Sequence, residues 1–453
     1  MSSRAPVILT KFRNLGEQMK KIVKMSLVAA VAVTGLTTAN AKPLEEAIKN
    51  VDVSGTVVYR YEDRSFDDNV GDSSSNNYKI GLNLKSKVND DVSAVTRFLV
   101  AKPNPGGLQA DGGFATLDNT TTGDKNPEVT LSNVYFSYTG IANTTVNVGK
   151  QGLTTPWTVA VDSDGNEQTG TGILALTSVG PVTLAAAYFN QTNLDVSGDA
   201  KINGSETLGD TYNAAVNGIA KNSDSFTGVP AQLDGAANIL TVGAMANVGP
   251  VALDAWYLDM QDLFDTYTVG AAAKFDLDAV KLSVGARHTE LEFDKKVNED
   301  LAKEDNSLTK IMLGLKAGIF GANVNYGWTD KQGGLAALDN DATTAMQGWT
   351  VQLNGFADAQ YLQVSVDAQV LESLNIALKY HQLDKDKIDG ATGTREKDAT
   401  DTETYVQVTY DMSKNLSTYI RFGEQELERA YTKNGDVKDA EGTIGRLQVQ
   451  YSF

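Results

Sequence analysis

The chain ends in Thr443-Ile444-Gly445-Arg446-Leu447-Gln448-Val449-Gln450-Tyr451-Ser452-Phe453. The odd-numbered positions are mostly apolar and become aromatic at Tyr451 and Phe453, whereas the even-numbered positions after Ile444 are polar or charged. A strand with this alternation fits an outer-membrane β-barrel, in which one face meets lipid and the other lines a wet lumen. A half-buried strand at the end of a soluble domain is the alternative.

The same alternation recurs along the chain between turn-like segments. It is clearest at 51–61, 77–85, 280–287, 374–381 and 416–422. Short turns are predicted at 89–91, 140–143, 178–181, 247–250, 276–279, 318–321, 371–373 and 412–414, and most contain Gly, Asn, Asp or Pro. Long connectors are predicted at 102–130, 191–236, 290–306, 330–358, 383–401 and 424–441.

This rhythm of short and long connectors indicates periplasmic turns and extracellular loops. We therefore predict an all-β fold, a transmembrane antiparallel barrel of about 18 strands within a range of about 16–18. The number is even because both ends of the barrel lie on the periplasmic side. The segments 205–236 and 348–356 remain ambiguous between strand and loop.

Aromatic residues gather near the strand ends, as expected where rings meet lipid headgroups. The predicted outer girdle contains Tyr59, Tyr61, Phe98, Tyr257, Trp328 and Tyr380. The predicted inner girdle contains Phe136, Tyr138, Phe275, Tyr410, Tyr451 and Phe453.

Composition excludes several classes of function. The chain of 453 residues has a formal net charge of −18, so it is not expected to bind nucleic acid. It contains no Cys and two His, which removes thiol catalysis and Cys-ligated zinc. Because no hydrolase, metalloprotease or phosphate-loop motif occurs, we do not expect an enzyme.

The N-terminus is predicted to be an export signal. Lys20, Lys21 and Lys24 precede an apolar stretch at 25–36, and Ala39-Asn40-Ala41 supplies a cleavage site. Residues 1–41 are thus an extension plus signal peptide, with Met19 as a more natural start. The barrel domain is expected to span 42–453, and the protein to reside in the bacterial outer membrane.

Several stretches resemble a known family. They are Lys42-Pro43-Leu44-Glu45-Glu46-Ala47-Ile48-Lys49-Asn50-Val51-Asp52-Val53-Ser54-Gly55, Tyr135-Phe136-Ser137-Tyr138-Thr139, Gly149-Lys150-Gln151 and Trp157. Together they resemble the Campylobacter-type major outer membrane porins. The resemblance implies a homotrimeric general porin with a preference for cations, although this chain departs from the family in its loops.

A basic wall is the first candidate for the pore constriction. Strand parity points Arg60, Lys79 and Arg97 inward from the first strands, and Arg421 and Arg446 inward from the last two. Because the last strand must pair with the first to close a barrel, these five cations are predicted to form one patch near mid-height. Charge spread evenly over a wet lumen wall is the alternative.

The third loop, predicted at about 152–172, is the second candidate. It carries Asp162, Asp164 and Glu167 and no basic residue. An inward-folded acidic loop facing a basic wall would set up a field across the pore that favours polar solutes. The resemblance places Asp164 near an acidic residue of the family's inward loop. An exposed acidic loop with no such role is the alternative.

The segment 162–165 also looks like part of a calcium loop, but it lacks the spacing of an EF-hand. No cofactor is required by this interpretation. A Ca²⁺ ion held by Asp162 or Asp164, with Asp195 or Asp199 from another loop, is a hypothesis that related porins suggest.

The sequence therefore predicts a water-filled channel for passive diffusion of ions and small hydrophilic solutes. Loop acids elsewhere would favour cations by raising their local concentration. The alternatives are a channel specific for carboxylates or small sugars, and a barrel serving mainly as an adhesin or structural envelope protein. Predicted partners are outer-membrane lipid and lipopolysaccharide, and the barrel-assembly machinery through Phe453.

Overall fold

The structure is a computed structural model. It describes residues 51–67, 72–101, 113–117, 128–163, 165–195, 197, 235–295, 306–331, 333–390, 393–395, 397–433 and 436–453. The predicted signal peptide, Asp164, Asp199 and most of the connectors 102–130 and 191–236 lie outside these ranges, so the expectations attached to them stay predictions.

The described elements are strands. They are β1 (Val51–Phe66), β2 (Ser73–Lys87), β3 (Val92–Ala101), β4 (Ala115–Leu117), β5 (Glu128–Tyr138), β6 (Thr144–Gly152), β7 (Thr169–Val179), β8 (Val182–Thr192), β9 (Ile239–Val248), β10 (Val251–Met260), β11 (Phe264–Leu277), β12 (Val280–Phe293), β13 (Asn306–Ala317), β14 (Phe320–Thr329), β15 (Ala359–Leu371), β16 (Leu374–Lys385), β17 (Ile388–Gly390), β18 (Gly393–Arg395), β19 (Ala399–Ser413), β20 (Leu416–Lys433) and β21 (Asp436–Ser452). No helix within these ranges is long and apolar enough to cross a membrane.

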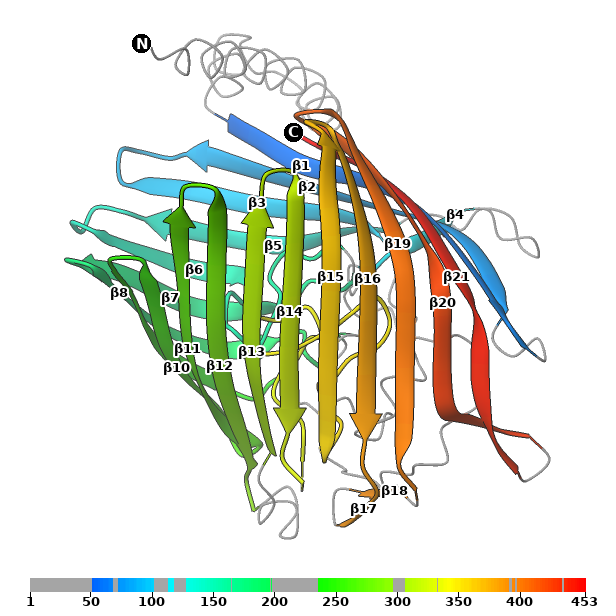
Figure 1. The fold of residues 1–453 in the computed structure, drawn as a ribbon. Coiled ribbons are helices and arrows are strands. Elements are labelled where there is room, and N and C mark those ends of the chain that lie inside the picture. The colour runs from blue at the N-terminus through cyan, green and yellow to red at the C-terminus, as the bar shows by residue number, and fades with distance from the viewer. Residues whose placement is uncertain are drawn as a thin grey trace.

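Eighteen of these strands form one closed antiparallel barrel (Figure 1), as the alternation predicted. The same sheet also includes the three-residue β4, which pairs with the outer part of β2, while β17 and β18 form a separate hairpin. The barrel closes between β1 and β21, where Val57 lies opposite Tyr451. Backbone hydrogen bonds of 2.9 and 3.0 Å between Gly55 and Phe453 complete this seam.

The two faces of the barrel wall follow the sequence parity. Aliphatic side chains exposed on the outer face include Val57, Leu184, Leu253, Val284, Leu313, Val366, Leu378 and Ile420. Aromatic residues of both predicted girdles are exposed as well: Tyr59, Tyr257, Trp328 and Tyr380 toward one end, and Phe136, Tyr138, Phe275 and Tyr410 toward the other. An apolar outer face edged by aromatic rings is what a lipid bilayer requires.

All eight predicted short turns are present, but two connectors differ from expectation. The segment 424–441 is mostly strand, because β20 and β21 remain paired as far as Lys433 and Asp436. The segment 330–358 does join β14 to β15 at the end opposite the short turns, as predicted for a long loop, but it folds into the barrel. The trace of this segment runs inside the ring of strands (Figure 1). Many of its side chains, including Trp349 and Leu353, are buried, and 348–356 forms no barrel strand.

Four of the short turns share one backbone requirement. Each joins its strands through two residues, of which the first has a positive φ: 59° at Gly180, 59° at Gly249, 58° at Gly318 and 59° at Asp278. This conformation matches the twist of a hairpin and is tolerated best by glycine. Asp278 therefore carries a strain that its three glycine counterparts avoid.

Opposite substitutions at equivalent turns should have opposite effects on stability. We expect Gly318→Val to lower the thermal unfolding temperature of the detergent-folded barrel, because a β-branched residue at positive φ costs roughly 1–2 kcal/mol. Asp278→Gly should raise it or leave it unchanged. Heat-modifiability on semi-native gels measures both effects, and a destabilised Asp278→Gly barrel would contradict the assignment.

Candidate functional site

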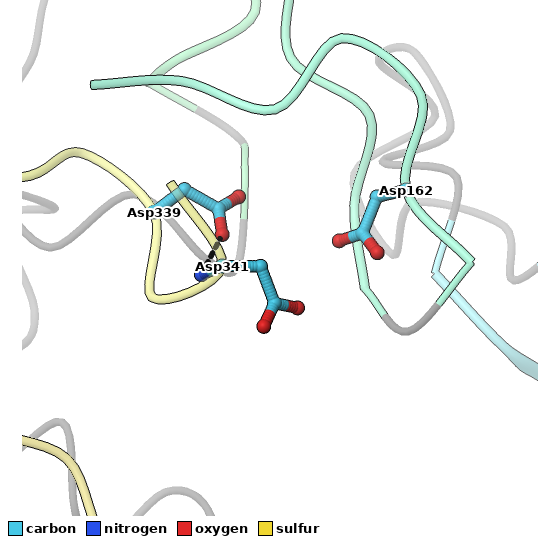
Figure 2. Close-up of side chains that lie close together, drawn as sticks. All are labelled: Asp162, Asp339 and Asp341. Carbon is cyan, nitrogen blue, oxygen red and sulfur yellow. Dashed lines mark hydrogen bonds between the residues drawn. The ribbon is translucent and has the colours of Figure 1, made fainter. Parts of the chain in front are cut away.

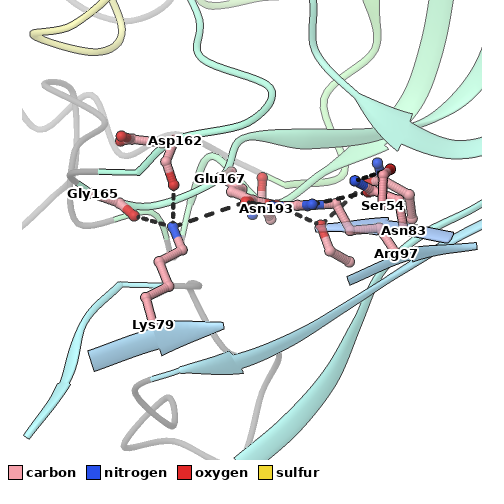
Figure 3. Close-up of polar contacts among 10 residues, drawn as sticks. Ser54, Lys79, Asn83, Arg97, Asp162, Gly165, Glu167 and Asn193 are labelled. Atoms are coloured by element: carbon pink, nitrogen blue, oxygen red, sulfur yellow. Dashed lines mark hydrogen bonds and ion pairs between the residues drawn. The ribbon is translucent and has the colours of Figure 1, made fainter. Parts of the chain in front are cut away.

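Buried charges attach the loop 153–168, between β6 and β7, to the inner wall. Arg97 on β3 donates two hydrogen bonds to the Glu167 carboxylate, Nε to Oε2 at 2.7 Å and Nη2 to Oε1 at 2.5 Å. Lys79 on β2 donates to the backbone oxygens of Asp162 and Gly165 at 2.5 and 2.7 Å (Figure 3), and its Nζ lies 3.9 Å from Glu167. The side chains of Lys79, Arg97 and Glu167 are at most 3% exposed.

Local irregularities of the wall make room for this attachment. A β-bulge inserts Ser132 between the residues that face Arg97 and Phe98, and the Ser132 hydroxyl donates to Glu167 at 3.2 Å. Bulges commonly re-aim a side chain in this way. Gly81 leaves the space through which Arg97 passes, because a Cβ at Gly81 would lie 2.5 Å from Nη2 of Arg97. The wall is thus shaped to receive Glu167.

A second loop, 330–358, is held from both sides. Lys310 on β13 donates to the backbone oxygens of Thr343 and Ala345 at 2.8 and 2.5 Å. On β19, the fully buried Glu403 accepts hydrogen bonds from backbone N–H groups of the loop at 2.5, 2.8 and 3.2 Å and interacts with His381 Nδ1 at 2.6 Å. The three loop donors are Trp349, Thr350 and Val351.

The two loops meet inside the barrel. The backbone N–H of Leu338 donates to the Trp157 oxygen at 2.9 Å, and that of Thr344 donates to the Pro156 oxygen at 3.0 Å. The amide of Gln168 donates to the Leu338 oxygen at 3.0 Å. An apolar cluster fills the junction, with Leu153, Trp157, Leu335 and Leu338 against wall residues such as Phe189, Ile239, Leu258 and Leu291. Loops from distant parts of the ring therefore form one body that narrows the lumen.

Three carboxylates converge where these loops meet (Figure 2). One carboxylate oxygen from each of Asp162, Asp339 and Asp341 lies within 4.8 Å of the others. Asp162 and Asp339 are 5% and 1% exposed, whereas Asp341 is exposed. Such a group repels itself strongly and suits a hard cation, which prefers several oxygen ligands. Asp195, which the sequence suggested as a ligand, does not belong to this group.

The predicted basic wall is divided in two. Arg60, Arg421 and Arg446 do lie together across the closing seam, since Arg446 pairs in register with Arg421 and neighbours the Arg60–Gln448 pair. Arg446 forms an ion pair with Glu62 at 2.5 Å, and Arg60 donates to Gln448 at 2.6 and 2.8 Å.

Lys79 and Arg97, by contrast, are covered by the loop 153–168. Both bind Glu167 directly. The sequence predicts the two cations on one side of an open eyelet and Glu167 on the other, and the structure does not show that arrangement. The reason is electrostatic: a carboxylate and a guanidinium buried together require each other as partners.

Sequence reasoning missed several residues of this site. Lys310, Glu403, Trp349, Asp339 and Asp341 were not predicted. The available signal was the composition of 330–358, which contains Leu335, Leu338, Met346, Trp349, Val351, Leu353 and Phe356. That apolar content is unusual for an exposed loop and typical of a packed one. An inward-facing cation or anion at mid-strand, as at Lys310 and Glu403, is a second signal for a docked loop.

A closed antiparallel barrel narrowed by loops docked inside it defines an outer-membrane channel of the porin class. The family model described as Campylobacter major outer membrane protein matches residues 19–453, and the chain belongs to this family. It is therefore an outer-membrane protein with a porin-type barrel, which implies a channel rather than an enzyme.

Solved structures agree with this fold. Pseudomonas aeruginosa OccK2 (OpdF) has a TM-score of 0.65 at 14% identity, covering 89% of this chain and 98% of that one. P. aeruginosa OccK1 (OpdK) has a TM-score of 0.64 at 12% identity, covering 89% and 99%. Acinetobacter baumannii OccAB3 has a TM-score of 0.63 at 12% identity, with the same coverage of 89% and 99%. At these identities the likeness concerns the fold alone. A search of curated proteins found no match.

Removal of the Glu167 charge should release the loop 153–168. Glu167→Gln leaves Arg97 buried without its anion, a loss of about 3–5 kcal/mol in docking energy. We expect larger open-channel current noise in planar bilayers, at unchanged barrel content by circular dichroism. Glu372→Gln, an equivalent change in an exposed turn, is the matched control and should stay quiet. A Glu167→Gln channel as quiet as the wild type would contradict the anchoring role.

Proposed function

We propose that this protein is a general diffusion porin, a water-filled channel for ions and small hydrophilic solutes. The observation that carries the proposal is the joined pair of inward loops, 153–168 and 330–358, attached to the wall by buried charges. Loops that are fixed to the wall hold the constriction at a constant width and do not swing across it. A constant width is what size-limited passive diffusion requires.

We further propose a mild preference for cations. The chain carries a formal net charge of −18, and three carboxylates gather at the junction of the two loops. Acidic groups in a channel raise the local concentration of cations and repel anions. The basic residues at the seam oppose this trend only in part, because Arg446 is neutralised by Glu62.

A bound divalent cation is a second proposal, and the convergence of Asp162, Asp339 and Asp341 favours it. We propose Ca²⁺ because three carboxylates can supply up to six hard oxygen ligands. This set shares only Asp162 with the one suggested by the sequence. A cation here would neutralise the repulsion among the carboxylates and so fasten the two loops to each other.

We also propose that the protein forms homotrimers in contact with lipopolysaccharide, and that Phe453 serves as an assembly signal. Its ring stacks on Tyr451 with centroids 5.5 Å apart, so the terminal aromatic pair forms one apolar patch. These three points rest on the family and on the sequence pattern.

Single-channel recording in planar bilayers tests the porin proposal. We expect stepwise conductance and, in a salt gradient, a reversal potential on the cation side. Asp341→Asn should shift that potential toward zero, because it removes an exposed charge at the loop junction. Asp90→Asn, in an exposed periplasmic turn, is the matched control and should leave it unchanged. Well-folded protein without conductance would overturn the proposal in favour of an adhesive or structural role.

Thermal unfolding in detergent tests the calcium proposal. After treatment with a chelator, added Ca²⁺ should stabilise the wild type by about 2.7 kcal/mol at a concentration 100 times the dissociation constant. Asp339→Asn should abolish this gain, whereas Asp195→Asn should keep it. An equal gain in Asp339→Asn would place the ion elsewhere, and no gain in the wild type would remove it.

A further inference from the structure

Two cations on the described inner wall lie together in one cavity without a carboxylate partner among the described residues. Lys379 on β16 and Arg421 on β20 have no carboxylate within ion-pair distance among the described residues, and Lys379 Nζ has no hydrogen-bond acceptor there. Arg421 uses only its Nε, which donates to Gln407 at 2.6 Å. Four other inward cations of the described wall pair with carboxylates: Arg97 with Glu167, Arg287 with Asp254, Lys385 with Asp401 and Arg446 with Glu62. Lys310 instead binds two loop carbonyl oxygens.

Aromatic rings hold these two cations in place. Lys379 Nζ and Arg421 Cζ each lie 5.7 Å from the ring centroid of Tyr405, which stands on the strand between them. Arg421 also lies 4.7 Å from the Tyr419 ring and 5.6 Å from the Trp349 ring. Contact with the rings orients a guanidinium but does not neutralise its charge. The two terminal nitrogens of Arg421 therefore keep their capacity to bind an anion.

Both cations line a polar cavity of about 270 Å³ beneath the loop 330–358. Its remaining lining includes amides and a hydroxyl: Asn323, Asn325, Gln347, Gln363 and Ser365. The nearest acids form no ion pair with these cations among the described residues and are engaged elsewhere. Glu403 already accepts several hydrogen bonds from the loop, and Asp367 accepts one from Asn375 at 2.9 Å.

We propose that this cavity is a binding subsite for a small carboxylate solute within the channel. The Nη edge of Arg421 fits the two oxygens of a carboxylate, and the Lys379 ammonium adds a second charge-assisted bond. The amides would bind further polar groups of the solute. This proposal rests on the proposed channel function and adds a class of solute to it. The subsite would bind an anion in a chain whose overall charge favours cations.

Benzoate, with benzamide as its uncharged counterpart, is the probe for this subsite in single-channel recordings. We expect millimolar-range benzoate to produce brief current blocks that benzamide does not. Lys379→Gln and Arg421→Gln should each weaken the block about tenfold or more, because each removes a charge-assisted hydrogen bond. Lys281→Gln, which removes an exposed cation at the periplasmic end of β12, should leave it unchanged.

The outcomes separate the subsite from the channel. A conducting wild type without benzoate block overturns the subsite alone, and so does a block that persists in both variants. A protein that folds but does not conduct overturns the porin proposal, and the subsite with it. The two substitutions lie on different strands, so either one suffices for the test if the other prevents folding.

Discussion

The closure of the barrel between β1 and β21 is the constraint on which the structure depends. Lipid offers no hydrogen bonds, so every backbone group in a membrane-spanning strand must be satisfied by a neighbouring strand. The pairing of Val57 with Tyr451, sealed by Gly55 and Phe453, leaves the ring without an open edge. It also brings residues from the two ends of the chain, such as Arg60 and Gln448, into direct contact.

The loops inside the closed barrel also need partners for their backbone polar groups. Loops that fold into the lumen bring polar backbone groups away from bulk water, and these groups need partners. The wall supplies them with charges: Lys79 and Lys310 bind loop carbonyl oxygens, and Glu403 binds loop N–H groups. Charged partners form stronger hydrogen bonds than neutral ones, so a few side chains suffice to fix each loop. These hydrogen bonds are strong because they are buried, away from water.

How much could be predicted from the sequence follows from this division. Strand alternation has a strict period of two, so the barrel, its lipid-facing side and its short turns were predicted correctly. Closure also predicted one patch of five cations, of which Arg60, Arg421 and Arg446 lie on neighbouring strands at the seam. Loop docking has no such period. Parity placed Lys79 and Arg97 inside but could not reveal that Glu167 covers them, and the partners of the loop 330–358 are far away in sequence.

Inward charges in the lumen differ in whether they have a partner of opposite charge. An inward arginine that meets a carboxylate, as Arg97 meets Glu167, serves the architecture, because separating them would leave a buried charge uncompensated. An inward cation that meets only rings and amides, as Arg421 does, is stabilised in position while its charge stays available. In this acidic chain, such a cation lacks a carboxylate partner among the described residues although carboxylates lie nearby. If the proposed subsite binds carboxylates, the balance between paired and available charge at the wall adds to net charge in setting solute preference.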